Sequence, residues 1–504
     1  MALAGTARAS DIPVADRPRI TDPLDDAARD RFAASLCGEG QRRVYRSVTV
    51  RGERIDYELT LGAILLHDAQ RQPRARFVYF AYRRRNAGSQ PRPVTFAWGG
   101  GPSGPATSYH FGCLGPQLQV EGNDMAWRDN PESILDQSDL VFVDPVGTGW
   151  SVPAGRYTLG DFYSVAKDAG SVADFILAYL RETGRSTAPI YLTGRSYGTL
   201  RLPAVVATLQ AKAVKVAGIF PVSAAMDGNA FWEGSGNMAA FYLMLPNYAA
   251  IAWHHKRQSQ PAATVDAAVA EAAEFALGDY ISALMRWPDL PASQRSAVLD
   301  RLHDLTGISQ DVWARYRLRI NGNAFAQEFL KPQGKLLNSG DGRRSRPVRQ
   351  DAPGVSTLAP PTLSVTDHYA RQMFGLTNAP GYRGLAPGVY TDDWKPGPLG
   401  WDMTDHRAFH DAGGLLVPCY PNYLDDIAAA LSFNPMMRVQ QHNGHYDLQC
   451  SSFPGMWSLA RMNIPAEAAG NVKAYSYASG HGLYDSDATR SAFLENVRTI
   501  FAPG

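Results

Sequence analysis

The sequence predicts an α/β protein: a sheet covered by helices on both faces and interrupted by a mainly helical insertion. Three observations support this fold class. Strand and helix signals alternate from residue 139 to 224, the alternation gives way to helical periodicity after about residue 228, and strand signals return at 436–447 and 472–485. Strands that alternate with helices are typical of a parallel sheet with helices packed on its faces.

The composition is that of a globular protein. The chain has 504 residues, of which 45% are apolar and 19% charged, and its formal net charge is +1. A chain of this length can form more than one domain-sized unit. Its charge gives no reason to expect nucleic acid or acidic membranes as partners. Because it has neither a run of about 20 apolar residues nor an apolar leader, we expect a soluble protein, with compartment and oligomeric state left open.

Four cysteines are present: Cys37, Cys113, Cys419 and Cys450. They are too few and too scattered for a disulfide scaffold or a zinc motif. We expect buried thiols, or at most one bridge, and no metal or other cofactor.

The elements of the predicted sheet begin after an N-terminal arm, residues 1–42. Four strand candidates lie between residues 43 and 100: "RVYRSVTVRG", "RIDYELTLGAILL", "ARFVYFAYRRR" and "PVTFAWGG". The apolar strand in "DLVFVDPVGTGWS" (139–151) is followed by a helix over 161–184 with apolar residues at helical spacing. "PIYLTG", "SYGTLRLPAVVATLQ" and "VKVAGIFPVSA" then predict a strand, a helix and a strand.

The predicted insertion is residues 229–395. Helices are expected at 264–286, 291–304 and 309–318, and a loop rich in glycine and proline at 339–361. The sheet is completed by the strands within 436–447 and 472–485, and a helix at 486–501 closes the chain. We therefore predict a core of residues 43–228 and 396–504 with a helical cap over its pocket.

One short motif points to nucleophilic catalysis. Gly194-Arg195-Ser196-Tyr197-Gly198 matches G-x-S-x-G, and it follows a predicted strand and opens a predicted helix. In this nucleophile elbow the serine sits on a cramped turn where neighbouring side chains would clash. The start of the helix also directs backbone N–H groups toward a developing oxyanion.

A serine hydroxyl needs a histidine base that is oriented by a carboxylate. In α/β-hydrolases these residues follow in the order Ser, Asp or Glu, His, each in a loop after a strand. Asp447 and His481 occupy such loops. Four residues compete with them: Asp425 and Asp426 in a helix-like stretch, and His442 and His445, which lie close to Asp447. His445 is too near Asp447 in sequence to reach a different loop.

Several blocks together resemble the serine carboxypeptidase family, especially its bacterial branch. They are "WGGGPSGP", "DPVGTGWS", "GRSYG", "HYDLQC" and "ASGHGLY", in this order, with "LPNYAAIAWHHKR" and "FALGDY" inside the insertion. The resemblance covers roughly residues 45–500. It implies an α/β-hydrolase fold with a helical cap and a catalytic triad of Ser196, Asp447 and His481.

The resemblance also implies an oxyanion hole made by the backbone N–H groups of Tyr197 and Gly101, with Gly100 and Arg195 as substrate-binding candidates. By itself "GGGPSGP" can also be a tight turn, and it lacks the spacing of a phosphate or dinucleotide loop. Asp144 in "DPVGTGWS" is expected to cap its turn, where Gly147 and Gly149 supply the conformation, and that turn either is architectural only or also lines the pocket.

The chain departs from the family where carboxypeptidases hold the substrate's terminal carboxylate. An asparagine and two acidic residues are replaced here by Gly99, Arg195 and Cys113. Arg195 can bind a carboxylate through two parallel hydrogen bonds. It can equally form a structural ion pair with an acid of the cap, and the sequence does not decide between these.

Three functions follow as hypotheses. The first is a serine hydrolase that removes C-terminal residues from peptides. The second is an esterase, lactonase or acyltransferase that uses the same triad on a small molecule. The third is a binding protein that keeps only the fold, and the ordered triad argues against it. A small peptide or a small acyl compound is the expected partner.

Overall fold

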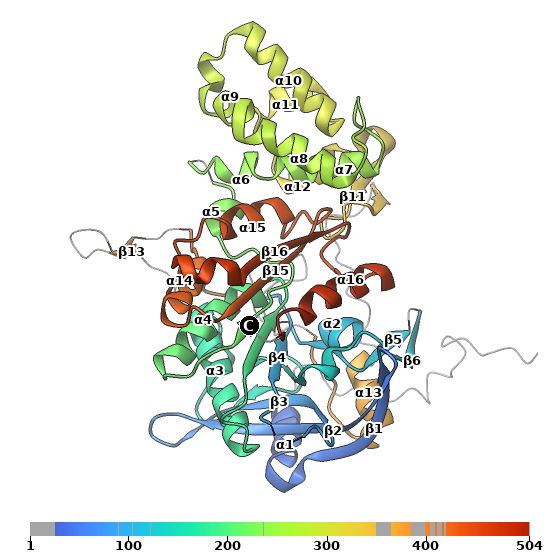
Figure 1. The fold of residues 1–504 in the computed structure, drawn as a ribbon, viewed down its shortest axis with the longest axis vertical. Coiled ribbons are helices and arrows are strands. Elements are labelled where there is room, and N and C mark those ends of the chain that lie inside the picture. Colours follow the sequence, from blue (N-terminus) through green and yellow to red (C-terminus); the bar gives the residue numbers. More distant parts are fainter. Residues whose placement is uncertain are drawn as a thin grey trace, which may run out of the picture.

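The computed structural model describes residues 26–88, 90–102, 104–120, 122–234, 236–348, 364–384, 399–403, 409–410, 416–417 and 420–502 (Figure 1). Among these residues, the main sheet has ten strands. Their order is β1 (Arg42–Val50), β2 (Glu53–His67), β3 (Pro73–Arg84), β7 (Asp139–Val143), β4 (Val94–Trp98), β9 (Ile190–Gly194), β10 (Gly218–Ile219), β15 (Arg438–Gly444) and β16 (Val472–Tyr477), with β8 (Val152–Pro153) paired to β3.

The sheet is antiparallel at one side and parallel at the other. β1, β2, β3 and β7 pair antiparallel, and every pair from β7 to β16 is parallel. The carboxyl ends of the parallel strands therefore lie along one edge. Loops that follow β4, β9, β15 and β16 meet there, as is usual for the active sites of open α/β sheets.

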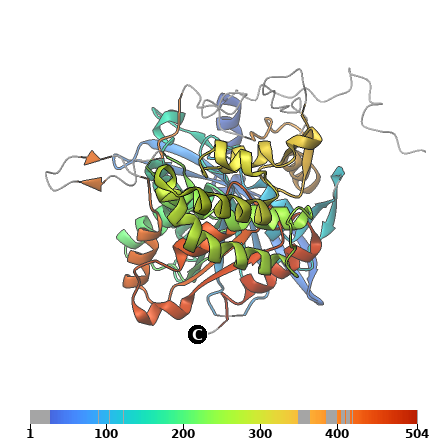
Figure 2. The same ribbon diagram turned by 90° about the horizontal axis from the view of Figure 1, so that it is seen from above.

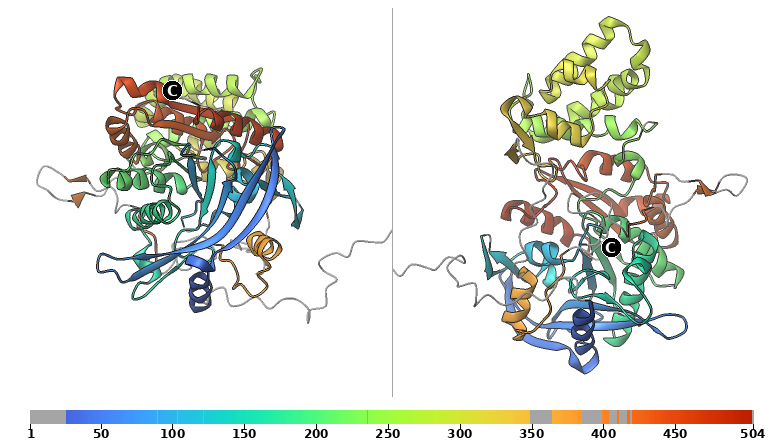
Figure 3. Two further views of the ribbon diagram at one scale, coloured as in Figure 1. Left: turned by 60° about the horizontal axis from the view of Figure 1, so that its bottom comes forward. Right: turned by 180° about the vertical axis from the view of Figure 1, so that it is seen from behind.

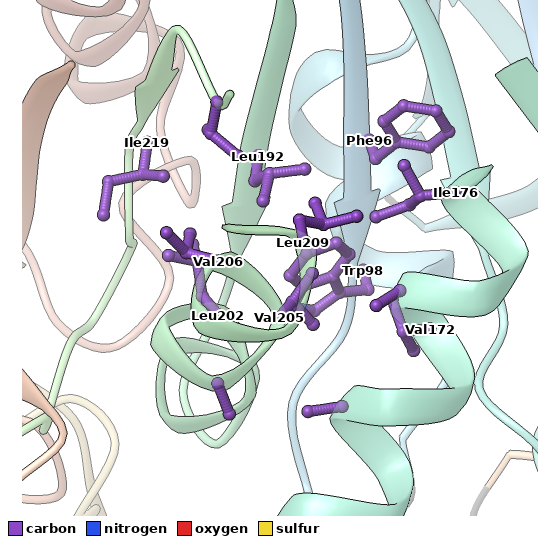
Figure 4. Close-up of a cluster of buried hydrophobic side chains, with 14 of the residues drawn as sticks. Phe96, Trp98, Val172, Ile176, Leu192, Leu202, Val205, Val206, Leu209 and Ile219 are labelled. Atoms are coloured by element: carbon purple, nitrogen blue, oxygen red, sulfur yellow. The ribbon is translucent and has the colours of Figure 1, made fainter. Parts of the chain in front are cut away.

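Helices cover both faces of the sheet. One face carries α3 (Val165–Glu182), α4 (Gly198–Ala211) and α14 (Leu424–Phe433), and the other carries α1 (Asp26–Ser35), α2 (Thr107–Tyr109), α13 (Val365–Phe374) and α16 (Asp487–Arg498). Side chains alternate along each strand, so Phe96 and Trp98 of β4 pack on the first face while Ala97 packs on the second. Figure 4 shows Trp98 between Val172 of α3 and the apolar side chains of α4.

The insertion forms its own apolar cluster. Its helices are α5 (Gly228–Phe231), α6 (Ala239–Tyr242), α7 (Leu245–His254), α8 (Val265–Phe275), α9 (Ile281–Arg286), α10 (Ala292–Thr306), α11 (Gln310–Arg315) and α12 (Gly322–Glu328). A hairpin of β11 (Lys335–Leu337) and β12 (Ser345–Pro347) follows them. Figures 1 and 2 show these helices gathered beyond β15 and β16. Leu448 and Cys450 of the core join the same cluster.

The remaining elements are short. They include the hairpin of β5 (Gln117–Val120) and β6 (Asn123–Asp129), the pair β13 (Phe409–His410) and β14 (Leu416–Val417), and helix α15 (Ser452–Leu459). The predicted helices at 264–286, 291–304 and 309–318 are confirmed as α8 to α11, with a π-helical turn at Ala276–Tyr280 between α8 and α9.

Two segments pack on the core although the sequence analysis assigned them elsewhere. Helix α13, inside the predicted insertion, contacts β1 and β6, and its Tyr369 hydroxyl lies 2.9 Å from that of Tyr82 (Figure 3). Helix α1, inside the predicted arm, buries Ala33 against the sheet. The predicted boundary at 395–396 lies outside the described residues, so the domain division stays a prediction.

Across the part of the chain that the structure covers, no helix combines the length and the apolar character needed to span a membrane. Cys37, Cys113 and Cys450 are free thiols, and Cys419 lies outside the described residues.

Candidate active site

Ser196 lies on a sharp turn between β9 and α4. Its φ is +55°, in the left-handed region that residues with a side chain rarely adopt, and its N–H donates to the carbonyl of Val222 at 3.0 Å. A Cβ atom on Gly194 would lie 2.3 Å from the carbonyl oxygen of Gly198, and one on Gly198 would lie 2.5 Å from that of Gly99. The two motif glycines are therefore required by the close approach of backbone segments.

The glycine-rich turn after β4 packs directly on this serine. A Cβ atom on Gly100 would lie 2.8 Å from Cβ of Ser196 and 3.3 Å from the backbone nitrogen of Tyr197. Gly101 follows with a φ of +117°. The segments that carry the two predicted oxyanion donors are thus in contact, and only glycine permits that contact.

Asp447 and His481 are brought together by the parallel pairing of β15 and β16. Nδ1 of His481 lies 2.7 Å from Oδ2 of Asp447, whose side chain is fully buried. The other carboxylate oxygen accepts from the backbone N–H of Gln449 at 2.8 Å. With Nδ1 engaged by Asp447, Nε2 is the nitrogen of His481 that remains for proton transfer.

Ser196 and His481 line one cavity of about 840 Å³. The other residues that line it are Gly100, Gly101, Gly104, Pro105, Thr107, Ser108, Arg195, Ser339, Gly384 and Gln449. Ser339 belongs to the insertion and Gln449 to the loop after β15. The cavity therefore lies where the carboxyl edge of the sheet meets the insertion. Its volume is large enough for a small organic substrate.

Cys450 is a member of the site that the sequence analysis did not single out. Its sulfur lies within 4.8 Å of the ligand atoms of Asp447 and His481, and the Ser196 side chain interacts with the thiol. Burial, reinforced by the charge of Asp447, raises the pKa of this thiol well above its ordinary value, so it stays protonated. The signal was its place in "HYDLQC", three residues after Asp447.

The histidines that competed for the base role have other partners. His442 lies inside β15, where burial lowers its pKa to about 3, and its Nδ1 lies 2.9 Å from the Tyr477 hydroxyl. His445 contacts Ser452 through Nδ1 and Asp266 through Nε2, each at 3.0 Å. Asp425 and Asp426 lie in the first turn of α14. None of these four residues lines the cavity within the described part of the chain.

Arg195 lies at the cavity wall beside Ser196. It donates to the Ser108 hydroxyl at 3.1 Å, and its guanidinium carbon lies 5.6 Å from the centre of the Tyr484 ring. Its Nε is buried without a hydrogen-bond partner. No carboxylate of the described residues lies within 4.0 Å of the guanidinium, so among them the structural ion pair is not found.

The other replaced clamp positions do not offer charge. A Cβ on Gly99 would lie 2.0 Å from the carbonyl oxygen of Pro105, so a larger residue does not fit there. Cys113 is fully buried, and burial raises the pKa of its thiol. Arg195 is thus the charged side chain among the three replacements.

Asp144 supports the architecture of the site. Its carboxylate accepts from the backbone N–H of Ala106 at 3.1 Å and from the Tyr382 hydroxyl at 2.8 Å. Gly147 and Gly149 adopt positive φ angles, and a Cβ on Gly149 would lie 2.2 Å from Asp144. Asp144 is not among the residues that line the cavity. Of the two expectations, the described structure favours the architectural one.

Comparisons with solved structures find proteins that are similar to this chain over most of its length. A prohormone-processing carboxypeptidase from Saccharomyces cerevisiae is similar over 88% of this chain and 91% of its own, with 12% identity and a TM-score of 0.51. A thermostable carboxyl esterase from Bacillus coagulans is similar over 88% and 99%, with 11% identity and a TM-score of 0.37. At such identities the likeness to the carboxypeptidase shows the fold. No curated protein sequence matches the chain.

The family comparison is more specific than the structural likeness. Residues 66–263, which include the glycine-rich turn and the elbow, match the family model described as serine carboxypeptidase. This match confirms the resemblance to the serine carboxypeptidase family over residues 66–263, and together with the shared α/β-hydrolase fold it supports a serine hydrolase.

Proposed function

We propose that the chain hydrolyses acyl compounds through an acyl-enzyme on Ser196, with His481 as general base and Asp447 as its orienting carboxylate. The observation that carries this proposal is the 2.7 Å contact of His481 with Asp447, beside the cavity that Ser196 also lines. A serine on a strained turn beside a cavity and an oriented imidazole are the parts that nucleophilic acyl transfer requires.

The reaction follows from these roles. Oγ of Ser196 attacks the carbonyl carbon while Nε2 of His481 accepts its proton, and the resulting oxyanion accepts hydrogen bonds from the N–H groups of Tyr197 and Gly101. Collapse of the intermediate breaks the bond to the leaving amine or alcohol, which takes the proton from His481. Water, activated by the same base, then cleaves the acyl-enzyme, releases the acid and restores Ser196.

The substrate that we propose first is a peptide from which C-terminal residues are removed. Arg195 supports this choice because its guanidinium lies at the cavity, beside Ser196 and the Ser108 hydroxyl, and its buried Nε lacks a partner. A guanidinium together with a hydroxyl can hold a terminal carboxylate. An arginine holds it by charge, with no shared proton, so binding does not require acidic conditions.

A second candidate is an esterase, lactonase or acyltransferase that acts on a small molecule. It is favoured by Gly99 and the neutral, buried thiol of Cys113, which leave no carboxylic acid at the positions of the family's clamp. In that case the acyl chemistry stays the same, and the group held near Arg195 differs.

A substrate panel separates the two candidates. N-blocked dipeptides with a free C-terminus are compared with the corresponding C-terminal amides and with p-nitrophenyl esters, and the Ser196→Ala variant measures the background. Exopeptidase activity predicts that the free-acid dipeptides have the higher kcat/KM. Turnover of esters alone would support the second candidate, and turnover that persists in Ser196→Ala would contradict the proposed nucleophile.

A further inference from the structure

The turn of the β11–β12 hairpin, residues 338–344, lies against both loops that carry the proposed base and its carboxylate. It belongs to the insertion, whereas Asp447 and His481 follow strands of the core. We call it the hairpin loop. Nothing in the proposed chemistry uses this loop directly, so its contacts need a separate explanation.

The hairpin loop forms backbone hydrogen bonds with the residues immediately before and after Asp447. The carbonyl of Ser339 accepts from the N–H of Leu448 at 3.0 Å, and the N–H of Gly342 donates to the carbonyl of Tyr446 at 2.8 Å. The residues on either side of Asp447 are therefore both fixed by backbone hydrogen bonds. Loops at the edge of a sheet are otherwise among the more mobile parts of a fold.

The same loop also holds His481. The carbonyl of Gly340 accepts from the N–H of His481 at 2.6 Å. A Cβ atom on Gly480 would lie 2.5 Å from that carbonyl oxygen and 2.6 Å from Cβ of Asp341. Only glycine at 480 permits so close an approach, and the approach fixes the backbone immediately before the imidazole.

One side chain of the hairpin loop contacts both catalytic loops at once. Arg343 donates through Nη1 to the carbonyl of Ala478 at 3.1 Å, and its guanidinium carbon lies 5.2 Å from the centre of the Tyr446 ring. The guanidinium is held by Asp341, which is 4% exposed and accepts from Nε at 2.9 Å and Nη2 at 2.8 Å. The side chain thus joins the loop of His481 to the loop of Asp447.

We propose that Arg343, oriented by Asp341, is a positioning residue that sets the distance between His481 and Asp447, and that the hairpin loop is the part of the insertion which does this. The inference rests on the proposed function for its kinetic consequence. A misplacement of about 1 Å in a catalytic group can lower a rate by about 100-fold, so a contact that fixes two loops relative to each other has a large effect.

Arg343→Gln tests the proposal, with Arg344→Gln as its matched control. The two substitutions remove the same charge at adjacent positions. The Arg344 side chain, however, is 65% exposed, and its ion pairs are longer: Nε lies 3.5 Å from Oδ2 of Asp341, and Nη2 lies 4.0 Å from Oδ2 of Asp485. Arg343→Lys keeps the positive charge but lacks the planar guanidinium group, whose several N–H donors reach both Asp341 and the carbonyl of Ala478. Three quantities are measured for each variant: kcat, KM, and the low-field proton resonance of the His481 Nδ1–H.

The proposal predicts that Arg343→Gln lowers kcat by about tenfold or more while KM changes by less than about twofold, because binding groups are not touched. The low-field resonance should broaden or move upfield, Arg343→Lys should recover part of kcat, and Arg344→Gln should match the unmodified protein. Equal effects of Arg343→Gln and Arg344→Gln, or a change in KM alone, would overturn it. So would a low-field resonance that Arg343→Gln leaves unchanged.

The failure of this inference can be told apart from failure of the proposed function. Labelling of Ser196 by a fluorophosphonate reports whether the nucleophile is active, and the proton resonance reports on His481 and Asp447 without any substrate. If Ser196 is labelled and Arg343→Gln behaves as Arg344→Gln does, only the positioning role is wrong. If Ser196 is not labelled, the proposed function is wrong while the resonance still decides the positioning role.

Discussion

Ser196 illustrates how single residues define this site. Its left-handed backbone angle costs roughly 1–3 kcal/mol, and hydrogen bonds from the Ser196 N–H to Val222 and from the Thr199 N–H to the Ser196 carbonyl hold it in place. Gly100 packs on its Cβ from the other side. The serine is thus held by the backbone on both sides, while its hydroxyl reaches the cavity.

The prediction about substrate choice concerns one residue, Arg195. If it holds a substrate carboxylate, Arg195→Gln should lower kcat/KM for free-acid dipeptides by about 30-fold, which corresponds to roughly 2 kcal/mol, and change the values for amides and esters much less. The activity of the unmodified enzyme on acidic substrates should persist at neutral pH, because an arginine holds a carboxylate by its charge and without a shared proton.

The comparison of the two substrate types is its own control. Equal losses on both, or a lower Tm with unchanged specificity, would make Arg195 a structural residue. Ser108→Ala removes the neighbouring hydroxyl that Arg195 contacts at 3.1 Å and should produce a smaller loss in the same direction.

At the scale of elements, a buried ion pair joins α3 to α4 beneath the oxyanion turn. Nε of Arg201 lies 2.6 Å from Oδ2 of Asp168, and these side chains are 0% and 3% exposed. Arg201 also donates to the carbonyl of Gly99 at 3.2 Å, and the Tyr197 hydroxyl donates to Asp168 at 3.1 Å. The pair therefore ties the glycine-rich turn to the start of α4.

Removing one partner of this pair should be costly. Arg201→Met is expected to lower the free energy of unfolding by about 3–5 kcal/mol, because it leaves the Asp168 charge buried without that partner. The double variant Arg201→Met, Asp168→Leu should recover most of the loss. Urea denaturation of the single and double variants measures this coupling, and losses that simply add would contradict it.

The elements themselves were largely predictable from the sequence. Alternating apolar residues identified β2, β3 and β4, and helical periodicity identified α3 and the insertion helices. The positions of α1 and α13 were not predictable, because nothing in a helix's own periodicity says which surface it packs on. Motif order was enough to propose Asp447 and His481 as the carboxylate and the base, whereas the contacts of Cys450 and Arg343 depend on how distant segments dock.

At the scale of the whole molecule, Asp144 connects three separate parts of the chain. It directly follows β7, accepts a hydrogen bond from the backbone N–H of Ala106, and accepts another from the hydroxyl of Tyr382, which follows α13. Burial raises its pKa from 3.8 to about 7. Between these values the folded protein keeps a proton that the unfolded chain releases, so its contribution to stability is full below about pH 4 and is lost as the pH rises through 7.

Comparison with Asp144→Asn isolates this contribution, since all other titrating groups are common to both proteins. From about pH 4 to 7, the free energy of unfolding of the unmodified protein should fall relative to the variant by up to about 1.4 kcal/mol per pH unit, and the difference should level off above pH 7. Urea denaturation across this range provides the measurement. Parallel curves for the two proteins would show that Asp144 does not titrate in this way.

The central proposal for the whole molecule is that the fold positions Ser196 as an active nucleophile. The most direct test is to treat the full-length protein with a fluorophosphonate and to locate the adduct by mass spectrometry of its peptides. Covalent labelling on Ser196, absent in Ser196→Ala and much slower in His481→Ala, is the predicted result. An intact, folded protein that gains no adduct, or gains it on another residue, would contradict the account.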